Sequence, residues 1–340
     1  MKYRQAGNTG LRVSEIGFGC GGNAGLMLKG SAPDRQRVIA RALELGINYF
    51  DNAPDYGDGL SEENLGKDLK ALVARPIVVT KVEVRSADLG DVAGHVQRST
   101  EASLKRLGLD VVDILQIHNG PTRLQHGLQG RSYTQLGMDD YLGPRGALEG
   151  LQRVLRDGKA RFAGFICRGN DGDEVLELLG TGLFHMINVP YTLMNPTAGR
   201  AKPEGLKVGR DFGAVIEAAR GQGAGVAVYS PLAGGFLTNQ CVAKGEHHAW
   251  SRAQDPASQD YRRNLAMARA LAFLSQLGKH SLAQAATRFV LMHPGVSVVL
   301  GGFSDLAQLE HAVPAGCEGP LDAQLMARVE NVWKSNFGLT

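Results

Sequence analysis

Cysteine is scarce in this sequence, which contains only four in 340 residues. Cys20, Cys167, Cys241 and Cys317 lie far apart, without a CxxC pair or a neighbouring cluster of metal ligands. This spacing indicates neither a zinc site nor a disulfide framework. We therefore expect no metal centre, and four free thiols fit a reducing compartment.

Long apolar runs and a strong charge excess are also missing. The N-terminus MKYRQAGNTG lacks the apolar segment of a signal peptide, and no window approaches the roughly 18 uninterrupted apolar residues of a membrane helix. The formal net charge is only +3, which is too small to indicate a nucleic-acid partner. We therefore expect a cytoplasmic protein with no membrane segment and a small-molecule partner.

The composition that remains is that of an ordinary globular protein. Apolar residues make up 43% of the chain and charged residues 21%. A chain of 340 residues can form two domains, but α/β barrels of this length are common as one unit. We expect a single domain spanning residues 1–340.

Short apolar strands alternate with amphipathic helices along the chain. The opening KYRQAGNTGLRVSE predicts a β-hairpin around GNTG. After it we expect eight strands, at residues 15–19, 47–51, 77–81, 111–118, 160–166, 185–191, 225–230 and 297–302. We expect helices near residues 33–45, 61–72, 92–107, 146–157, 174–179, 212–222 and 281–292, and a short helix after residue 305.

Eight nearly continuous apolar strands, each followed by a helix, predict a parallel sheet closed into a (β/α)8 TIM barrel. The competing layout is a doubly wound open sheet. Such a sheet would carry GxGxxG after its first strand if it bound a dinucleotide, whereas GFGCGG has the wrong spacing. Two longer segments, 119–145 and 231–260, follow predicted strands, so we expect both as long loops over the carboxyl-terminal mouth. The first is either a substrate lid using Tyr133 and Tyr141 or a tolerated surface loop.

Four ionisable residues stand at or just after the ends of three successive strands: Asp51, Tyr56, Lys81 and His118. One such residue alone is usually a solvated strand end or a satisfied ion pair. Together the four suit proton-coupled hydride transfer at a carbonyl. Tyr56 would give the proton, and the Lys81 ammonium would lower the pKa of the Tyr56 hydroxyl. Asp51 would hold Lys81 through an ion pair, and His118 would donate a hydrogen bond to the substrate oxygen.

These segments resemble the aldo/keto reductase family over essentially the whole chain. The stretch NYFDNAPDYGDGLSEENLG matches the family's FDTAxxYGxxExxLG-type signature, and VVTK and DILQIH complete its four-residue catalytic pattern. The resemblance implies a (β/α)8 barrel that binds NADPH or NADH without a Rossmann motif. It also implies that Tyr56 is the acid/base, with Asp51, Lys81 and His118 in the roles given above.

The resemblance further implies a set of cofactor-binding positions. The stretch VAVYSPLAGGFLT is similar to the family's pyrophosphate loop, in which Tyr229 would stack on the nicotinamide. Asn188 stands where the family usually has a glutamine that holds the nicotinamide carboxamide. The remaining positions are Gly21 after the first strand, Ser230, Leu232 and Gly234 in the pyrophosphate loop, and Gly302, Ser304 and Gln308 at the adenosine end.

The sequence departs from the family pattern at both ends of the expected cofactor. At the nicotinamide end, Ile166 and Cys167 replace a Ser-Asn pair, for which Arg168 or Asn170 is the candidate substitute. At the adenosine end, the departures are Gly302 and Gln308 in place of basic residues and His311 and Ala312 in place of a Glu-Asn adenine clamp. A 2′-phosphate without a positioned cation gains little over a hydroxyl, so these changes weaken the family's preference for NADP over NAD.

The substrate pocket also lacks the family's tryptophans. Asn119 stands where several members that prefer aromatic or apolar substrates have one, and GCGGNAG lacks another. A polar pocket suits a hydroxylated aldehyde, a sugar or a lactol.

Two other functions stay open: a barrel isomerase or lyase using a Lys81 Schiff base, and a non-catalytic regulator that binds a nicotinamide nucleotide. A Schiff-base lysine must be neutral, so the neighbouring Asp51 disfavours the first of these.

Overall fold

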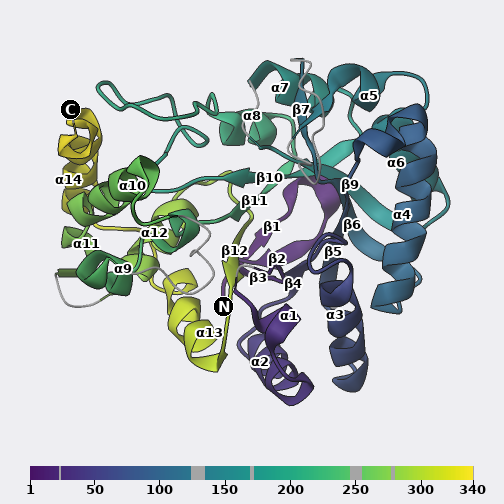
Figure 1. Ribbon diagram of the computed structural model, residues 1–340, viewed down its shortest axis with the longest axis horizontal. Coiled ribbons are helices and arrows are strands. Elements are labelled where there is room, and N and C mark those ends of the chain that lie inside the picture. Colours follow the sequence, from purple (N-terminus) through teal and green to yellow (C-terminus); the bar gives the residue numbers. More distant parts are fainter. Residues whose placement is uncertain (23, 124–134, 169–171, 246–254, 277–279, 340) are drawn as a thin grey trace.

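The computed structural model describes residues 1–22, 24–123, 135–168, 172–245, 255–276 and 280–339. Eight parallel strands form a closed barrel in the middle of the molecule (Figure 1). They are β3 (Ile16–Gly19), β4 (Tyr49–Asp51), β5 (Ile77–Val82), β6 (Val112–Ile117), β9 (Ala160–Ile166), β10 (Phe184–Pro190), β11 (Gly225–Tyr229) and β12 (Val298–Gly302). The strands pair in chain order, and β12 closes on β3. The predicted (β/α)8 fold is confirmed.

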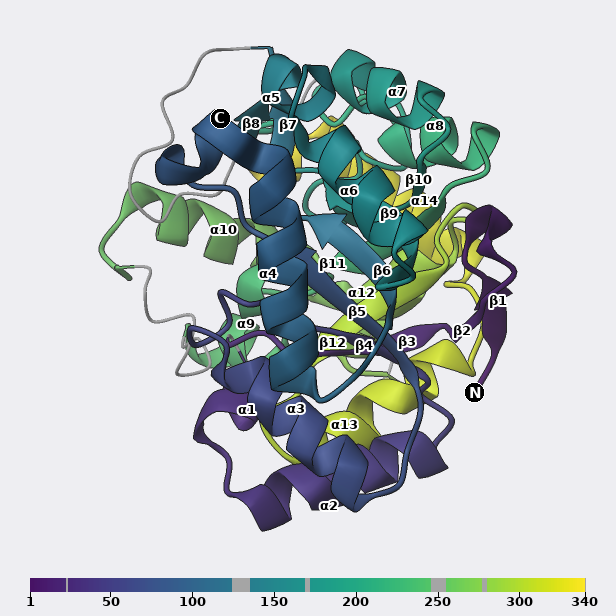
Figure 2. The same cartoon turned by 90° about the vertical axis from the view of Figure 1, so that its right-hand side faces the viewer.

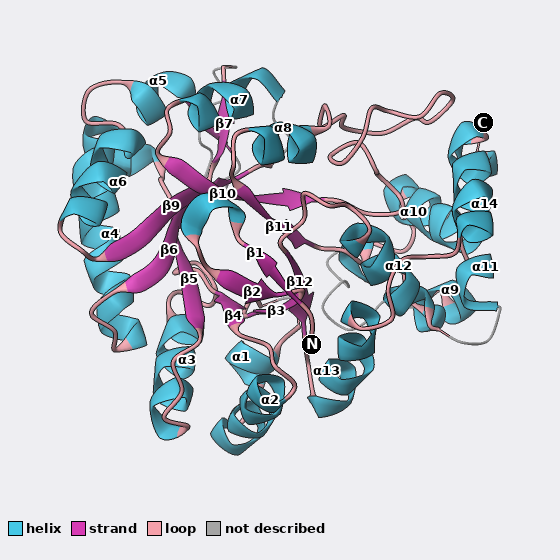
Figure 3. Cartoon of the chain, turned by 180° about the vertical axis from the view of Figure 1, so that it is seen from behind, coloured by secondary structure: helices cyan, strands magenta, loops and turns pink. Residues whose placement is uncertain are grey.

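Helices cover the outside of the barrel (Figure 3). Those expected from the sequence are α2 (Ala32–Glu44), α3 (Leu60–Ala71), α4 (Val92–Leu107), α6 (Ala147–Arg156), α7 (Gly172–Gly180), α8 (Val215–Gly221), α12 (Leu282–Leu291) and α13 (Leu306–Ala312). The sequence analysis did not predict α1 (Leu26–Lys29), α5 (Met138–Leu142), α9 (Asn239–Lys244), α10 (Gln259–Ala270), α11 (Phe273–Gln276) or α14 (Ala323–Lys334). Figure 2 shows α4 lying along the barrel next to α3 and α6.

The predicted N-terminal hairpin closes the amino-terminal end of the barrel. Strands β1 (Tyr3–Gln5) and β2 (Arg12–Ser14) pair antiparallel around a 3-10 turn. Gly7 in this turn has φ +54°, and a Cβ at this position would lie 2.3 Å from the Gly225 amide nitrogen. Only glycine allows this close approach. The interior apolar cluster that the hairpin covers consists of Ala6, Leu11, Val13, Tyr49, Val79, Ile114, Met186, Ala227, Val298 and Leu300.

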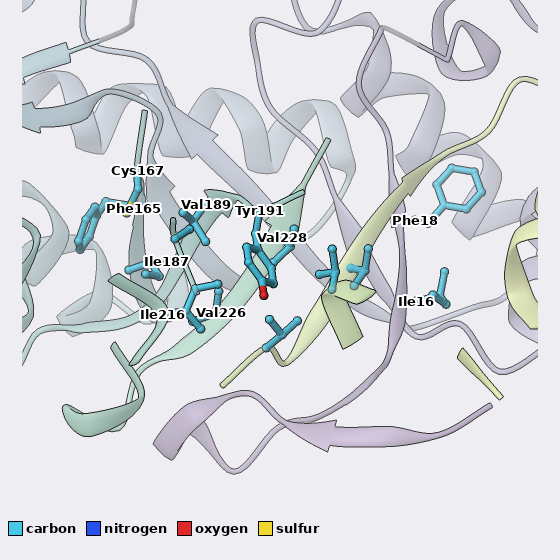
Figure 4. Packing of buried hydrophobic residues seen from close by; sticks show 14 of the residues in the cluster. Ile16, Phe18, Phe165, Cys167, Ile187, Val189, Tyr191, Ile216, Val226 and Val228 are labelled. Carbon is cyan, nitrogen blue, oxygen red and sulfur yellow. The ribbon is translucent and has the colours of Figure 1, made fainter. Parts of the chain in front are cut away.

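Alternation along the strands separates the site from the core. Successive side chains of a strand point to opposite faces, so the residue two places after an interior apolar residue also points inward, nearer the mouth. The inward polar or aromatic residues placed in this way are Asp51, Lys81, Gln116, His118, Asn188 and Tyr229. The other face packs on the helices. Figure 4 shows this for Val226 and Val228 of β11, which gather with Ile216 of α8.

The segment 119–145 follows β6 as expected, and its described ends are folded against the barrel. Strands β7 (Gly120–Thr122) and β8 (Gln135–Gly137) pair in parallel, and α5 follows them. Tyr141 on α5 is fully buried, contacts Phe165 edge to face, and donates a hydrogen bond from its hydroxyl to the Asn119 carbonyl oxygen. The interpretation of Tyr141 as a lid residue is therefore wrong, because the side chain anchors the segment. Tyr133 lies outside the described residues.

Candidate active site

Lys81 and Asp51 form a buried ion pair at the mouth. The Lys81 Nζ lies 2.5 Å from Asp51 Oδ1 and also donates to the Asn52 carbonyl oxygen at 2.6 Å. The two side chains are only 1% and 4% exposed. Burial is the largest single effect and lowers the pKa of Lys81, but Asp51, Tyr56 and Asp55 together raise it above its ordinary value. Lys81 is therefore charged at neutral pH.

Tyr56 lies directly above this pair. Its ring centroid is 5.1 Å from the Lys81 Nζ and 6.0 Å from the centroid of the His118 ring, which meets it edge to face. Gly21 lies near the hydroxyl end of the ring, where a Cβ would stand 3.6 Å from the phenol carbon that carries the Tyr56 hydroxyl. The structure thus brings the four predicted catalytic side chains together, with Gly21 beside them.

The pKa of Tyr56 differs from the sequence-based expectation. Burial raises the pKa of the Tyr56 hydroxyl to about 12, and the opposing effect of Lys81 is smaller. Lys81 does lower the pKa of Tyr56, as expected, but the removal of the phenolate from water raises it by more. The hydroxyl is therefore protonated at neutral pH, as a proton donor must be.

His118 is buried between two charged side chains. Its Nδ1 lies 3.0 Å from Asp55 Oδ1, and its Nε2 lies 2.8 Å from the Arg168 Nη2. Burial is the main cause that lowers the pKa of His118 to about 4, so the imidazole is neutral at physiological pH. The sequence analysis did not connect Asp55 or Arg168 with His118. Both residues follow a barrel strand, β4 or β9, and this position could have identified them as neighbours of His118 at the mouth.

Asn188 lies deeper than its expected cofactor role requires. It is 2% exposed, its Nδ2 donates to Asp51 Oδ2 at 3.0 Å, and its Oδ1 accepts from Gln116 Nε2 at 2.8 Å. Asn188, itself held by Gln116, therefore holds the second oxygen of Asp51, while Lys81 holds the first. The contact of Asn188 with a nicotinamide carboxamide stays a prediction.

The expected pyrophosphate loop lies at the mouth beside these residues. Tyr229 is half-buried, and its hydroxyl donates to the Cys167 carbonyl oxygen at 3.1 Å. It lines a hollow of about 500 Å³ together with Arg168, Pro190, Thr192, Asn195, Gly209, Arg210 and Phe212. In the loop, Ser230 and Gly234 are exposed and Leu232 is half-buried, and both Ser230 (φ +52°) and Gly234 (φ +69°) have left-handed backbone. Left-handed residues in a turn can make an amide concavity suited to a phosphate.

The expected adenosine end follows β12. Gly302 is exposed at the end of the strand, and Ser304 and Gln308 are half-buried. The Gln308 Oε1 accepts from the Ser304 amide at 3.0 Å, while the Ser304 hydroxyl donates to Asp305 Oδ2 at 2.8 Å. A carboxylate next to Ser304 is unfavourable for a neighbouring 2′-phosphate because the two charges repel.

Asn119 does not line a polar pocket as the sequence analysis expected. Its side chain is fully buried and pairs with the backbone of Val84, with Oδ1 accepting from the amide and Nδ2 donating to the carbonyl oxygen, each at 2.9 Å. Asn119 therefore ties the end of β6 to β5. Asn170, the other candidate at the nicotinamide end, lies outside the described residues.

The sequence analysis expected no metal centre, no disulfide framework and no membrane segment. In the described part of the chain, no three His, Cys, Asp or Glu side chains gather in a way that could hold a metal ion, and all four cysteines are free thiols. Burial raises the pKa of Cys20 and Cys167 well above the ordinary value, so both thiols are protonated. None of the described helices is both long and apolar enough to cross a membrane.

A closed parallel barrel with an ion-paired lysine beneath a tyrosine at its carboxyl mouth defines a class of barrel oxidoreductases. The model of the aldo/keto reductase family matches residues 15–334. L-galactose dehydrogenase of Arabidopsis thaliana is 30% identical over 356 aligned positions, which cover 100% of this chain and 97% of that protein. This chain belongs to the aldo/keto reductase family, whose members are oxidoreductases that use NAD(P)H.

Two further comparisons agree with this assignment. L-glyceraldehyde 3-phosphate reductase of Escherichia coli O157:H7 is 25% identical over 99% of this chain and 96% of its own length. The structure is similar to the holo form of an aldo-keto reductase of Bacillus halodurans, with a TM-score of 0.73 and 24% identity over 98% of this chain and 97% of that one. At this identity the structural similarity supports the fold.

Proposed function

We propose that this protein interconverts a carbonyl group and an alcohol, or a sugar lactol and a lactone, with NADP or NAD as cofactor and Tyr56 as acid/base. The observation that carries the proposal is the stack of Tyr56 over Lys81 at 5.1 Å, with Lys81 paired to Asp51 at 2.5 Å. A lone structural ion pair does not require a protonated phenol directly above it. A proton donor that leaves as a phenolate does benefit from a fixed cation.

The chain's own residues have separate tasks in this reaction. Tyr56 donates its proton to the substrate oxygen in reduction and takes it back in oxidation. The charged Lys81 stabilises the phenolate that remains, and Asp51 keeps Lys81 charged and in place. Asn188 fixes the second Asp51 oxygen and is itself fixed by Gln116, so the ammonium keeps its distance from Tyr56. When bound, a nicotinamide supplies or accepts the hydride.

The residues at the mouth fit such a cofactor. The half-buried Tyr229 ring borders the hollow of about 500 Å³ and can cover one face of a flat nicotinamide. The exposed backbone of Ser230 and Gly234 can accept a pyrophosphate, and Gly302 leaves the end of β12 without a side chain. These are the positions that the sequence analysis assigned to the cofactor.

The substrate class follows from the relatives and the lining of the hollow. The two relatives named above act, by their names, on L-galactose and on L-glyceraldehyde 3-phosphate. Thr192 and Asn195 supply polar groups to the hollow beside the apolar Pro190 and Phe212. We therefore propose a hydroxylated aldehyde or a sugar lactol as the substrate.

The contacts of Lys81 disfavour the alternative in which this residue forms a Schiff base. Lys81 is held by a carboxylate and by the Asn52 carbonyl oxygen, and its raised pKa keeps it charged, whereas imine formation needs a neutral amine. A non-catalytic regulator would bind the nicotinamide nucleotide as the enzyme does, and would differ only in lacking turnover. Both would bind the nucleotide, so the decisive observation is chemistry after binding.

The test of the proposed function combines binding with turnover. NADH and NADPH are titrated by fluorescence, and nucleotide absorbance then follows reduction of glyceraldehyde and oxidation of L-galactose. Binding with turnover of either compound supports the proposal. Tight binding with no turnover across a panel of hydroxyaldehydes and aldoses would favour the regulator, and no binding of either nucleotide would contradict both.

Gln308 provides a prediction about cofactor choice. We expect the wild type to discriminate between NADPH and NADH by about tenfold or less in Kd. One charge-assisted hydrogen bond contributes about 1.5 to 3 kcal/mol, and the two positions expected near the 2′-phosphate, Gly302 and Gln308, are uncharged. Gln308→Arg should tighten NADPH binding and leave NADH binding nearly unchanged, since only the 2′-phosphate offers a bidentate anion. Fluorescence titration with NADPH and NADH gives the Kd values of the wild type and the variant that test both expectations.

Gln308→Met is the matched control, because it also removes the contact with the Ser304 amide but adds no charge. It should leave the ratio of the two Kd values near the wild-type ratio. A strong wild-type preference for NADPH that Gln308→Arg does not alter would show that the phosphate is bound elsewhere.

A further inference from the structure

His118 has a different partner at each ring nitrogen. Nδ1 lies 3.0 Å from the carboxylate oxygen Oδ1 of Asp55, and Nε2 lies 2.8 Å from the Arg168 Nη2. A guanidinium can only donate hydrogen bonds, so Nε2 must be the acceptor in this contact. A neutral imidazole then carries its proton on Nδ1, the nitrogen that faces the Asp55 carboxylate.

Arg168 holds His118 at two points. Besides the contact with Nε2, its Nε donates to the His118 carbonyl oxygen at 3.2 Å. The backbone of Arg168 is held in turn, because Arg210 donates to its carbonyl oxygen at 2.7 Å. A planar guanidinium that grips both the ring and the backbone of one residue restricts that ring's rotation.

The charged surroundings agree with a neutral ring. Asp55, Tyr56, Lys81 and Arg168 face His118 from the loop after β4, from β5 and from the end of β9. Burial is the largest effect on the pKa of His118 and lowers it, Asp55 opposes this, and Lys81 and Arg168 add to the lowering. Burial therefore keeps the imidazole uncharged, and the two cations offset part of the opposing effect of Asp55.

We propose that Arg168 is a positioning residue that holds His118 as the neutral Nδ1–H tautomer, with Nε2 as a hydrogen-bond acceptor beside Tyr56. His118 then does not donate to the substrate oxygen through Nε2, in contrast to the role expected from the sequence. The Asp55 carboxylate completes the arrangement by facing the protonated Nδ1 at 3.0 Å. The catalytic consequence rests on the proposed function, whereas the tautomer itself does not.

The test is nitrogen-15 NMR of the His118 ring in the full chain without ligand, with His118→Gln used to assign the resonances. In the wild type we expect an unprotonated Nε2 and a protonated Nδ1 at neutral pH. In Arg168→Met we expect a mixture of tautomers. We also expect roughly a tenfold or greater decrease in the acid dissociation constant of His118, because a cation a few Å away is removed. Arg168→Lys should keep that constant closer to the wild-type value, since the charge remains.

Arg161→Met is the matched control. Arg161 lies near the start of β9, at the end of the strand away from Arg168, where it pairs with Asp113 at 2.7 Å, so both His118 properties should stay unchanged. A wild-type Nε2 that carries the proton would overturn the proposal, even if no Arg168 variant folds. The proposal would also be overturned if folded Arg168→Met kept the wild-type tautomer and the wild-type acid dissociation constant of His118.

Kinetics separate this proposal from the proposed function. If the chain turns over a hydroxyaldehyde, the acid limb of its kcat profile should move to higher pH in Arg168→Met and less so in Arg168→Lys. An acid limb that does not move in folded Arg168→Met would contradict the catalytic consequence. A wild type with the expected tautomer but no turnover would contradict the proposed function and leave the role of Arg168 intact.

Discussion

Tyr56→Phe should remove most of the carbonyl reductase activity while leaving nucleotide binding unchanged. The substitution removes only the hydroxyl, and the ring that faces His118 and Gly21 remains. Loss of a positioned general acid typically lowers the rate by about 10² to 10⁴. Initial rates of carbonyl reduction and fluorescence titration of the nucleotide measure the two effects separately.

The same hydroxyl predicts opposite pH dependences for the two reaction directions. Its pKa of about 12 keeps it protonated across the neutral range, so reduction should not lose rate until the pH becomes strongly alkaline. Oxidation needs the phenolate, so its rate should rise with pH.

Tyr3→Phe is the matched control for Tyr56→Phe, because Tyr3 lies on the exposed hairpin and its hydroxyl donates only to the Gly46 carbonyl oxygen among its described contacts. Unchanged turnover in Tyr56→Phe on every carbonyl that the wild type reduces would end the assignment.

Lys81→Met should slow the reaction and destabilise the protein together. Removal of the ammonium raises the pKa of Tyr56 further, since Lys81 is the main group that lowers it. It also leaves the Asp51 carboxylate buried with Asn188 as its described donor. A buried charge without its partner typically costs about 3 kcal/mol of unfolding free energy or more. Urea denaturation and kcat measure the two losses.

Asp51→Asn combined with Lys81→Met separates stability from catalysis. The double variant no longer buries a charge, so it should recover much of the lost unfolding free energy while its activity stays low. Recovery of activity in the double variant would contradict the role given to Lys81. Borohydride trapping of a covalent adduct on wild-type Lys81 would instead support the Schiff-base alternative.

The fold was predictable because its signal is repeated. Eight apolar strands in alternation with helices leave few other arrangements, and a hairpin turn such as GNTG is a local feature. Helices α10 and α14 were missed because they lie outside the eight repeats. Each also buries only a few residues, such as Tyr261 and Met267 on α10 and Val329 and Trp333 on α14.

The proximity of the four candidate catalytic side chains was predictable from the sequence, but their energetics were less so. Strand ends supplied Asp51, Lys81 and His118, but sequence spacing does not report burial, which reverses the expected pKa shift of Tyr56. Asn119 and Tyr141 were misjudged for a related reason. Both follow a strand near the mouth, and only their contacts with Val84 and Phe165 show that they point into the protein.

Transfer of deuterium tests the account most directly. Both C4-deuterated forms of NADH and NADPH, which differ in the face that carries the label, are mixed with the wild-type protein and glyceraldehyde or another hydroxyaldehyde that it reduces. Mass spectrometry of the alcohol then locates the label. The account predicts one deuterium on the former carbonyl carbon with one of the two labelled faces, and about 10² to 10⁴ slower labelling with Tyr56→Phe. Bound nucleotide with no label in any alcohol, or equally fast labelling by Tyr56→Phe, would contradict it.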